Sequence, residues 1–105
     1  MKILIIGGNG TIGKPVVAHF KEQNEVLIAG RSSGDITVDI ANSNSISKMF
    51  QKIGNVDAII CIAGEAKWAN FNELEEEDYH IGLNSKLMGQ VNLVRIGQNY
   101  LNTGG

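Results

Sequence analysis

The feature that most constrains the fold is the way the chain begins. Residues 3–6 are four consecutive aliphatic residues, and a glycine-rich run over residues 7–13 follows at once. An unbroken aliphatic run is typical of a strand in a parallel sheet that is buried on both faces. The hydrophobic residues then recur every four positions, at Ile12, Val16 and Phe20. This spacing marks one face of a helix, so the start of the chain predicts a strand, a glycine turn and an amphipathic helix that ends near Asn24.

The rest of the chain continues this alternation. Three further apolar runs predict strands, at residues 26–29, 36–38 and 56–62. Two more helical patterns are present: one is capped by Ser43 or Ser45 and stops at Gly54, and the other covers about residues 78–101. Strands that alternate with helices indicate a parallel sheet with right-handed crossovers. We therefore predict an α/β fold, the first half of a Rossmann-like doubly wound sheet, with strand order 3-2-1-4 in three αβα layers.

Length and composition restrict the class of protein. A chain of 105 residues forms one small domain, and its net charge of -2 does not suggest nucleic acid or an anionic membrane as the partner. Cys61 is the one cysteine, which is compatible with a reducing cytoplasm. No signal peptide is visible, and no apolar run reaches the roughly 18 residues of a membrane span. His19 and His80 lie far apart without partners at ligand spacing, so we expect no metal site.

The predicted last strand raises the question of what covers it. Residues 56–62 are as apolar as a central strand, yet no segment is left to pair with the outer edge of that strand. An uncovered apolar edge favours association with another chain. We therefore expect that residues 1–105 are a nucleotide-binding domain truncated at its C-terminus. Pairing of the edge in a dimer is the alternative.

The glycine run has the spacing G-x-x-G-x-x-G, with glycines at positions 7, 10 and 13. In a dinucleotide-binding turn the first allows a tight turn, the second admits the pyrophosphate and the third lets the helix pack closely against the sheet. The helix N-terminus behind such a turn attracts phosphate. The phosphate-binding candidates are therefore Gly7, Asn9, Gly10, Thr11, Ile12 and Gly13.

A competing phosphate motif overlaps this turn. Residues 8–14 read G-x-x-x-x-G-K, which is nearly a P-loop. A P-loop requires Ser or Thr next, as a ligand of magnesium, and Pro15 stands there instead. The strand at residues 56–62 also runs into Ala63 and Gly64 without an aspartate that would hold the metal. The nucleotide-triphosphatase interpretation is therefore the weaker one.

The end of the second predicted strand distinguishes the two nicotinamide cofactors. An NAD site usually places Asp or Glu there, about 20 residues after the glycines, to bind the ribose 2′-OH. Here the strand ends in Gly30, Arg31 and Ser32. The guanidinium of Arg31 would attract a 2′-phosphate, and the hydroxyl of Ser32 would donate a hydrogen bond to it. NADP is the predicted cofactor, and NAD remains the alternative because Asp35 lies nearby.

These features together resemble the short-chain dehydrogenase/reductase family over essentially the whole chain. The resemblance rests on the glycine turn, the Arg31-Ser32 tip, Asp39-Ile40 after the third strand and Ile62-Ala63-Gly64 after the fourth. It implies that Asp39 and Ile40 flank the adenine, and that Ala63 and Gly64 line the ribose beside the nicotinamide. It also implies a homodimer that pairs through the helix at residues 78–101.

Catalysis in the family uses an Asn, a Ser, and a Tyr followed four residues later by Lys. The resemblance offers Asn84 for the Asn, with Asn92 as a weaker candidate. Neither tyrosine begins a Tyr-x-x-x-Lys pair: Leu83 follows Tyr79 by four residues, and Gly104 follows Tyr100. The aromatic residues Trp68 and Phe71 either cover the cofactor or substrate or anchor their own loop.

Two functions stay open from the sequence. The first is an NADP-dependent short-chain oxidoreductase that acts on a carbonyl or alcohol substrate and has its Ser, Tyr and Lys outside this chain. The second is an NADP-binding regulator without turnover. Two features favour the regulator. Many family members have Asn at the position of Cys61, and the glycine spacing is atypical for the family.

Overall fold

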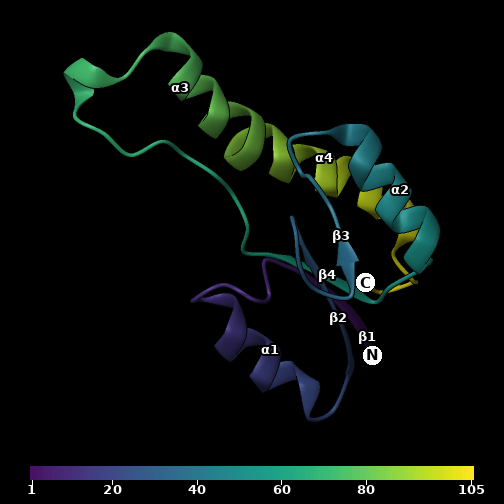
Figure 1. Ribbon diagram of the computed structural model, residues 1–105. Helices are drawn as coiled ribbons and strands as arrows, with labels where there is room; N and C mark the ends of the chain where they lie inside the picture. Colours follow the sequence, from purple (N-terminus) through teal and green to yellow (C-terminus); the bar gives the residue numbers. More distant parts are fainter.

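A parallel sheet of four strands lies at the centre of the fold, in the order β3-β2-β1-β4 (Figure 1). The computed structural model describes residues 1–105. Its strands are β1 (Lys2–Ile6), β2 (Glu25–Gly30), β3 (Ile36–Thr37) and β4 (Ala58–Cys61). Its helices are α1 (Gly13–Lys21), α2 (Ser43–Ile53), α3 (Glu76–Gly82), the π-helical segment η2 (Leu83–Leu87) and α4 (Met88–Gly97), with 3-10 turns η1 (Phe71–Glu73) and η3 (Gln98–Tyr100). The predicted α/β class and strand order are confirmed.

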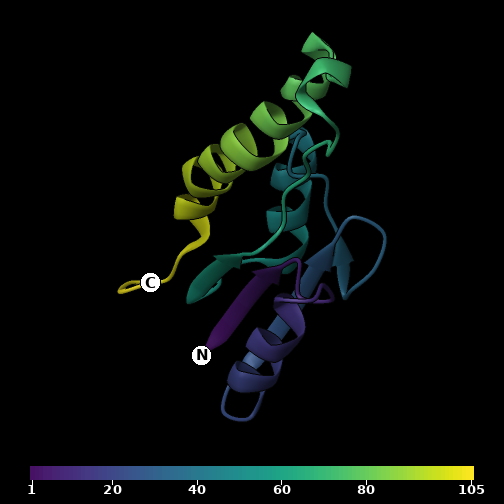
Figure 2. The same ribbon diagram turned by 90° about the vertical axis from the view of Figure 1, so that its left-hand side faces the viewer.

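The first strand is the centre of the core. β1 pairs with β2 on one side and with β4 on the other, so that Ile3 lies between Val26 and Ala58. All four of its aliphatic residues are buried, as the unbroken apolar run predicted. α1 covers one face of the sheet, and α2 and α4 cover the other (Figures 1 and 2). Leu4 and Ile6 belong to the cluster on the α2 and α4 side, together with Phe50. The three-layer arrangement follows directly from this alternation of side chains.

The cap of α2 differs from the prediction. Neither Ser43 nor Ser45 caps the helix: the side chain of Asn42 accepts hydrogen bonds from two backbone N–H groups of the first turn, at 2.9 and 3.3 Å. Asn42 lies in extended backbone, which points its amide oxygen at the open end of the helix. The hydroxyl of Ser45 instead accepts a hydrogen bond from the backbone N–H of Asp39. The predicted stop at Gly54 is confirmed.

The long helix is continuous but not uniform. It begins at Glu76, two residues before the predicted start, because Glu75 and Asp78 form a reciprocal capping box. A π-helical turn, η2, then separates α3 from α4, and no sequence signal predicted it. The helical path ends in η3, so that Leu101 is extended. No helix is long and apolar enough to cross a membrane.

The outer edge of the last strand is partly paired, which differs from the prediction. Only residues 58–61 of the predicted strand are regular β structure, and Val56 before them pairs in parallel with Leu101. The backbone N–H of Val56 donates to Tyr100, and Asn102 donates to the carbonyl oxygen of Val56, both at 2.9 Å. The statement that no segment pairs with this edge is therefore wrong at its first residue. Beyond it, β4 remains the edge of the sheet.

Candidate nucleotide-binding cleft

One cleft of about 310 Å³ lies where β1, β2 and β4 end. In parallel α/β sheets, ligands bind in the crevice outside the carboxyl ends of the strands, where the strand order reverses. The reversal here lies between β1 and β4, because β2 and β3 extend to the other side. The cleft is lined by seven of the predicted site residues: Gly7, Arg31, Asp39, Ile40, Ala63, Gly64 and Asn84. The remaining candidates, Asn9, Gly10, Thr11, Ile12, Gly13 and Ser32, do not line it.

The glycine turn is shaped by close backbone contacts. Gly7 has a φ of 89°, and a Cβ there would lie 2.9 Å from the backbone nitrogen of Ala63. A Cβ at Gly13 would overlap the carbonyl oxygen of Gly7. Gly10, by contrast, is exposed, and a Cβ there would meet only the same oxygen, at 3.4 Å. Gly13 therefore lets α1 pack closely on the turn, Gly7 lets the turn approach the backbone that follows β4, and Gly10 leaves open space over the turn.

The N-terminus of α1 is open to an anion. No side chain caps it, and its first-turn N–H groups carry the positive end of the helix dipole. Thr11 and Ile12 precede the helix and are exposed, and Ile12 stays 67% exposed despite its aliphatic side chain. The amide of Asn9 donates to the hydroxyl of Ser33 at 3.2 Å, which ties the turn to the loop after β2. The turn and the N-terminus of α1 thus present backbone donors next to Gly7, which is the residue of the turn that lines the cleft.

Arg31 reaches the cleft from the end of β2 and is paired. Its guanidinium forms an ion pair with the carboxylate of Glu65, and this bond raises the pKa of Arg31 above its ordinary value. Both side chains are exposed, at 64% and 55%. Glu65 was not predicted from the sequence, although it directly follows Ala63 and Gly64. Ser32 is exposed beside Arg31.

Asp35, the residue that left NAD as an alternative, is hydrogen-bonded to the backbone of β2. Its carboxylate accepts a hydrogen bond from the backbone N–H of Ile28 at 2.8 Å, and its own N–H donates to the carbonyl oxygen of Ile28 at 2.7 Å. It does not line the cleft. Its carboxylate therefore extends the pairing of β2 instead of pointing at the predicted nucleotide.

The loop after β3 forms the opposite wall. The carboxylate of Asp39 accepts from the backbone N–H of Ala41 at 3.0 Å, and Ile40 is buried. A Cβ at Gly89 of α4 would lie 3.1 Å from the end of the Ile40 side chain. Gly89, which the sequence analysis did not single out, therefore lets this loop pack against α4. Ile40 offers an apolar surface where the resemblance places the adenine.

The π-helical segment forms the floor on the β4 side. Asn84 lines the cleft, and the buried hydroxyl of Ser85 accepts from the backbone N–H of Glu65 at 2.9 Å. A Cβ at Gly64 would lie 2.8 Å from the Cγ of Lys86, so the lysine stem rests on this glycine. Asn92 accepts a hydrogen bond from Arg95 farther along the helix and does not line the cleft.

The end of β4 is held by a side chain from α4. The amide of Gln90 donates to the sulfur of Cys61 at 3.2 Å and to the carbonyl oxygen of Ala63 at 3.3 Å. Burial raises the pKa of the Cys61 thiol. Gln90 thus supplies an amide beside the position where the resemblance has Asn, and the sequence analysis did not identify it.

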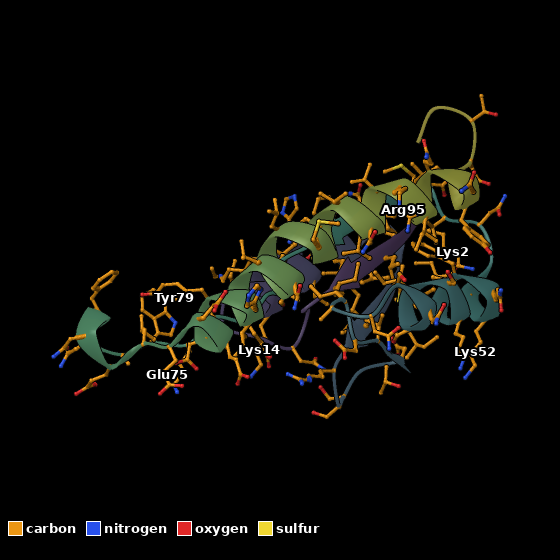
Figure 3. The ribbon with its side chains drawn as sticks, turned by 90° about the horizontal axis from the view of Figure 1, so that it is seen from above. Lys2, Lys14, Lys52, Glu75, Tyr79 and Arg95 are labelled. Atoms are coloured by element: carbon orange, nitrogen blue, oxygen red, sulfur yellow. The ribbon has the colours of Figure 1, made fainter.

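The aromatic residues lie outside the cleft. Tyr100 stacks on Phe50 with the ring centroids 5.0 Å apart, and Tyr79 meets Phe71 edge-on at 6.4 Å. Trp68 is 91% exposed on the segment that extends away from the sheet. Figure 3 shows Tyr79 on this projecting end of the molecule. None of these residues lines the cleft, so the structure brings no tyrosine to it.

Comparisons with known proteins relate this geometry to other chains. The sequence profile of the RmlD substrate binding domain matches residues 1–93. The solved structure of the protein lin1944 from Listeria innocua is 47% identical, with a TM-score of 0.93 over 97% of this chain and 51% of its own. A small-chain dehydrogenase is 27% identical, with a TM-score of 0.87 over 100% of this chain and 53% of its own.

A small-chain dehydrogenase in complex with NADPH is also 27% identical, with a TM-score of 0.86 over 100% of this chain and 48% of its own. The chain thus spans about half the length of these solved structures. A comparison with the curated proteins gives no match.

Proposed function

The chain belongs to the family of the RmlD substrate binding domain and has the fold of the short-chain dehydrogenases and reductases, and from this premise we propose that its cleft binds NADP. The observation that carries the proposal is the convergence of Gly7, Arg31 and Gly64 on one cleft at the carboxyl end of the sheet. A similar chain forms a complex with NADPH, which supports the same cofactor here.

The turn fits the phosphates of a dinucleotide. Gly10 has no side chain and no close neighbour on its open side, so a pyrophosphate would approach the backbone there. The uncapped N-terminus of α1 would donate to it. Arg31 would bind the 2′-phosphate with its planar guanidinium, and Ser32 would donate a hydroxyl.

The reaction we propose is hydride transfer between the nicotinamide and a carbonyl or alcohol substrate in the full-length protein. NADP supplies the hydride chemistry. Within this chain Asn84 lies in the cleft and would orient groups at the reacting end. The proton-transferring Ser, Tyr and Lys would come from residues beyond this domain, which agrees with the half-length match to the dehydrogenases.

A second function has an observation of its own. Cys61 stands where the resemblance has Asn, with the amide of Gln90 bonded to it, and neither tyrosine reaches the cleft. An NADP-binding regulator would keep the glycine turn and Arg31 and would need none of the proton-transfer groups. Oxidation of NADPH by the full-length protein with a panel of carbonyl compounds, followed by nicotinamide absorbance, separates the two functions.

Cofactor selectivity is tested by titration with 2′,5′-ADP and 5′-AMP. A charge-assisted bond to the 2′-phosphate should make 2′,5′-ADP bind about ten- to a hundredfold tighter. Arg31→Leu should remove this preference and leave 5′-AMP binding unchanged. Arg95→Leu is the matched control, because Arg95 is exposed on α4 and its side chain bonds to Asn92, away from the cleft. Equal affinity of the two nucleotides for the unaltered protein would refute NADP.

We further propose a homodimer that pairs through the long helix. Four aliphatic residues form an exposed stripe on it, at Leu83, Leu87, Val91 and Val94. Figure 3 shows this helix as an outer layer of the molecule. Val94 is 71% exposed, and a stripe of this kind is typical of an interface between helices. Val94→Lys should shift the mass found by sedimentation equilibrium towards the monomer, and an unchanged dimer would refute this pairing.

A further inference from the structure

The ion pair of Arg31 and Glu65 crosses the cleft. Arg31 follows β2 and Glu65 follows β4, and β1 lies between these two strands in the sheet. The pair therefore spans the carboxyl end of β1, and both partners line the cleft together with Gly7. Any nucleotide that lies across the end of β1 has to accommodate this bridge.

The backbone places Glu65 firmly at this position. Its N–H donates to the buried hydroxyl of Ser85, and Gly64 before it rests on the stem of Lys86. Glu65 is thus anchored to the π-helical segment, with its carboxylate directed at Arg31. Asp39 adds a second negative charge near the guanidinium and contributes to the raised pKa of Arg31. The guanidinium is therefore already occupied before any phosphate arrives.

From this geometry, and on the basis of the proposed NADP site, we infer that Glu65 determines cofactor selectivity by competing with the 2′-phosphate for Arg31. A guanidinium binds carboxylate and phosphate through the same fork of N–H donors. A 2′-phosphate has to displace the Glu65 carboxylate and is repelled by it. A ribose 2′-OH does neither, so NAD would leave the ion pair intact. Glu65 accordingly lowers the preference for NADP over NAD that Arg31 creates.

The size of the effect follows from the exposure of the pair. The loss of an exposed ion pair changes a binding constant by up to about fivefold. Removal of the repulsion between the Glu65 carboxylate and the phosphate increases the gain in affinity further. Glu65→Gln should therefore bind 2′,5′-ADP about three- to tenfold tighter, with unchanged affinity for 5′-AMP. The gain should shrink as salt is added, because both partners are exposed.

The experiment is a calorimetric titration of both nucleotides into the unaltered protein, Glu65→Gln, Glu65→Ala and Glu22→Gln. Glu22 is exposed at the end of α1, so its variant makes the same charge change away from the cleft and should bind like the unaltered protein. The double variant of Arg31→Leu with Glu65→Gln completes a cycle. The gain from Glu65→Gln should shrink there to the part that comes from relief of direct repulsion, because the rest of the effect acts through Arg31.

The outcomes separate this inference from the proposed function. Unaltered protein without a preference for 2′,5′-ADP would refute the NADP site itself. A preserved preference that Glu65→Gln and Glu65→Ala leave unchanged or weaken would refute only the role of Glu65. A gain that persists at full size in the Arg31→Leu background, or that is equal for both nucleotides, would also overturn competition for Arg31.

Discussion

Two glycines of one turn should respond differently to a single added methyl group. At Gly13 the methyl carbon would lie 2.7 Å from the Cα of Gly8 and would overlap the carbonyl oxygen of Gly7. Ordinary carbon contacts are about 3.5–4.0 Å, so α1 would have to move by about 1 Å. Overpacking of this kind costs about 1–3 kcal/mol. Gly13→Ala should therefore lower the free energy of unfolding by that amount.

At Gly10 the same methyl group meets one atom, the carbonyl oxygen of Gly7 at 3.4 Å. Gly10 is not among the glycines with positive φ, so alanine fits its backbone. Gly→Ala at a compatible position stabilises a protein by about 0.4–1 kcal/mol. Gly10→Ala should therefore fold at least as well as the unaltered protein. Its methyl group, however, would occupy the space in which we place the pyrophosphate, so NADP affinity should fall more than about tenfold.

The assay combines urea unfolding, followed by circular dichroism, with calorimetric titration of NADP. Gly13→Ala tests packing and Gly10→Ala tests binding, and each variant is the control for the other. An unchanged NADP affinity in Gly10→Ala would show that the turn has only a structural role. An unchanged stability of Gly13→Ala would refute the close packing of α1 on the turn.

Two further predictions concern stability. Asn42→Ala should lower the free energy of unfolding, measured in urea, by about 1 kcal/mol, because it removes the cap of α2. Ser43→Ala should change this free energy little, and equal losses in the two variants would refute Asn42 as the cap. The backbone N–H of Lys2 donates a hydrogen bond to the carboxylate of Asp57, which lowers the pKa of Asp57 below its ordinary value of 3.8. The stability that this hydrogen bond adds is complete above the pKa of Asp57 in the unfolded chain. It is lost as the pH falls through the lower pKa of Asp57 in the folded protein. The melting temperature of Asp57→Asn should therefore fall less steeply below about pH 4, and parallel curves would contradict this.

The fold was predictable because its signals are local. The apolar run of β1, the glycine turn and the four-residue period of α1 each lie within a short window, and the structure confirms their order and pairing. The resemblance to the short-chain dehydrogenases is confirmed as well. The errors arose where several local signals compete: Asn42, Ser43 and Ser45 are all good caps, and the backbone arriving from β3 selects the first.

The features that sequence reasoning missed depend on contacts between distant residues. Val56 and Leu101 pair only because the helix returns the chain to the outer edge of β4. Arg31 and Glu65 are likewise 34 positions apart, so their ion pair cannot be foreseen until the sheet brings the ends of β2 and β4 together. The π-helical turn at residues 83–87 has no local signature of its own, yet it holds the segment that carries Glu65.

Binding and turnover are separable in this architecture. The cleft is assembled from the segments that follow the four strands and from the π-helical segment, and Asn84 is the one residue offered for catalysis that lies in it. Asn84 is not among the residues that we assign to the phosphates, so Asn84→Ala should leave NADP affinity unchanged. If the full-length protein is an oxidoreductase, the same variant should lower kcat, because the amide would then orient groups at the reacting end. If the protein is a regulator, there is no turnover for the variant to change. A loss of NADP affinity in Asn84→Ala would instead place this side chain on the cofactor and would contradict the assignment to the reacting end.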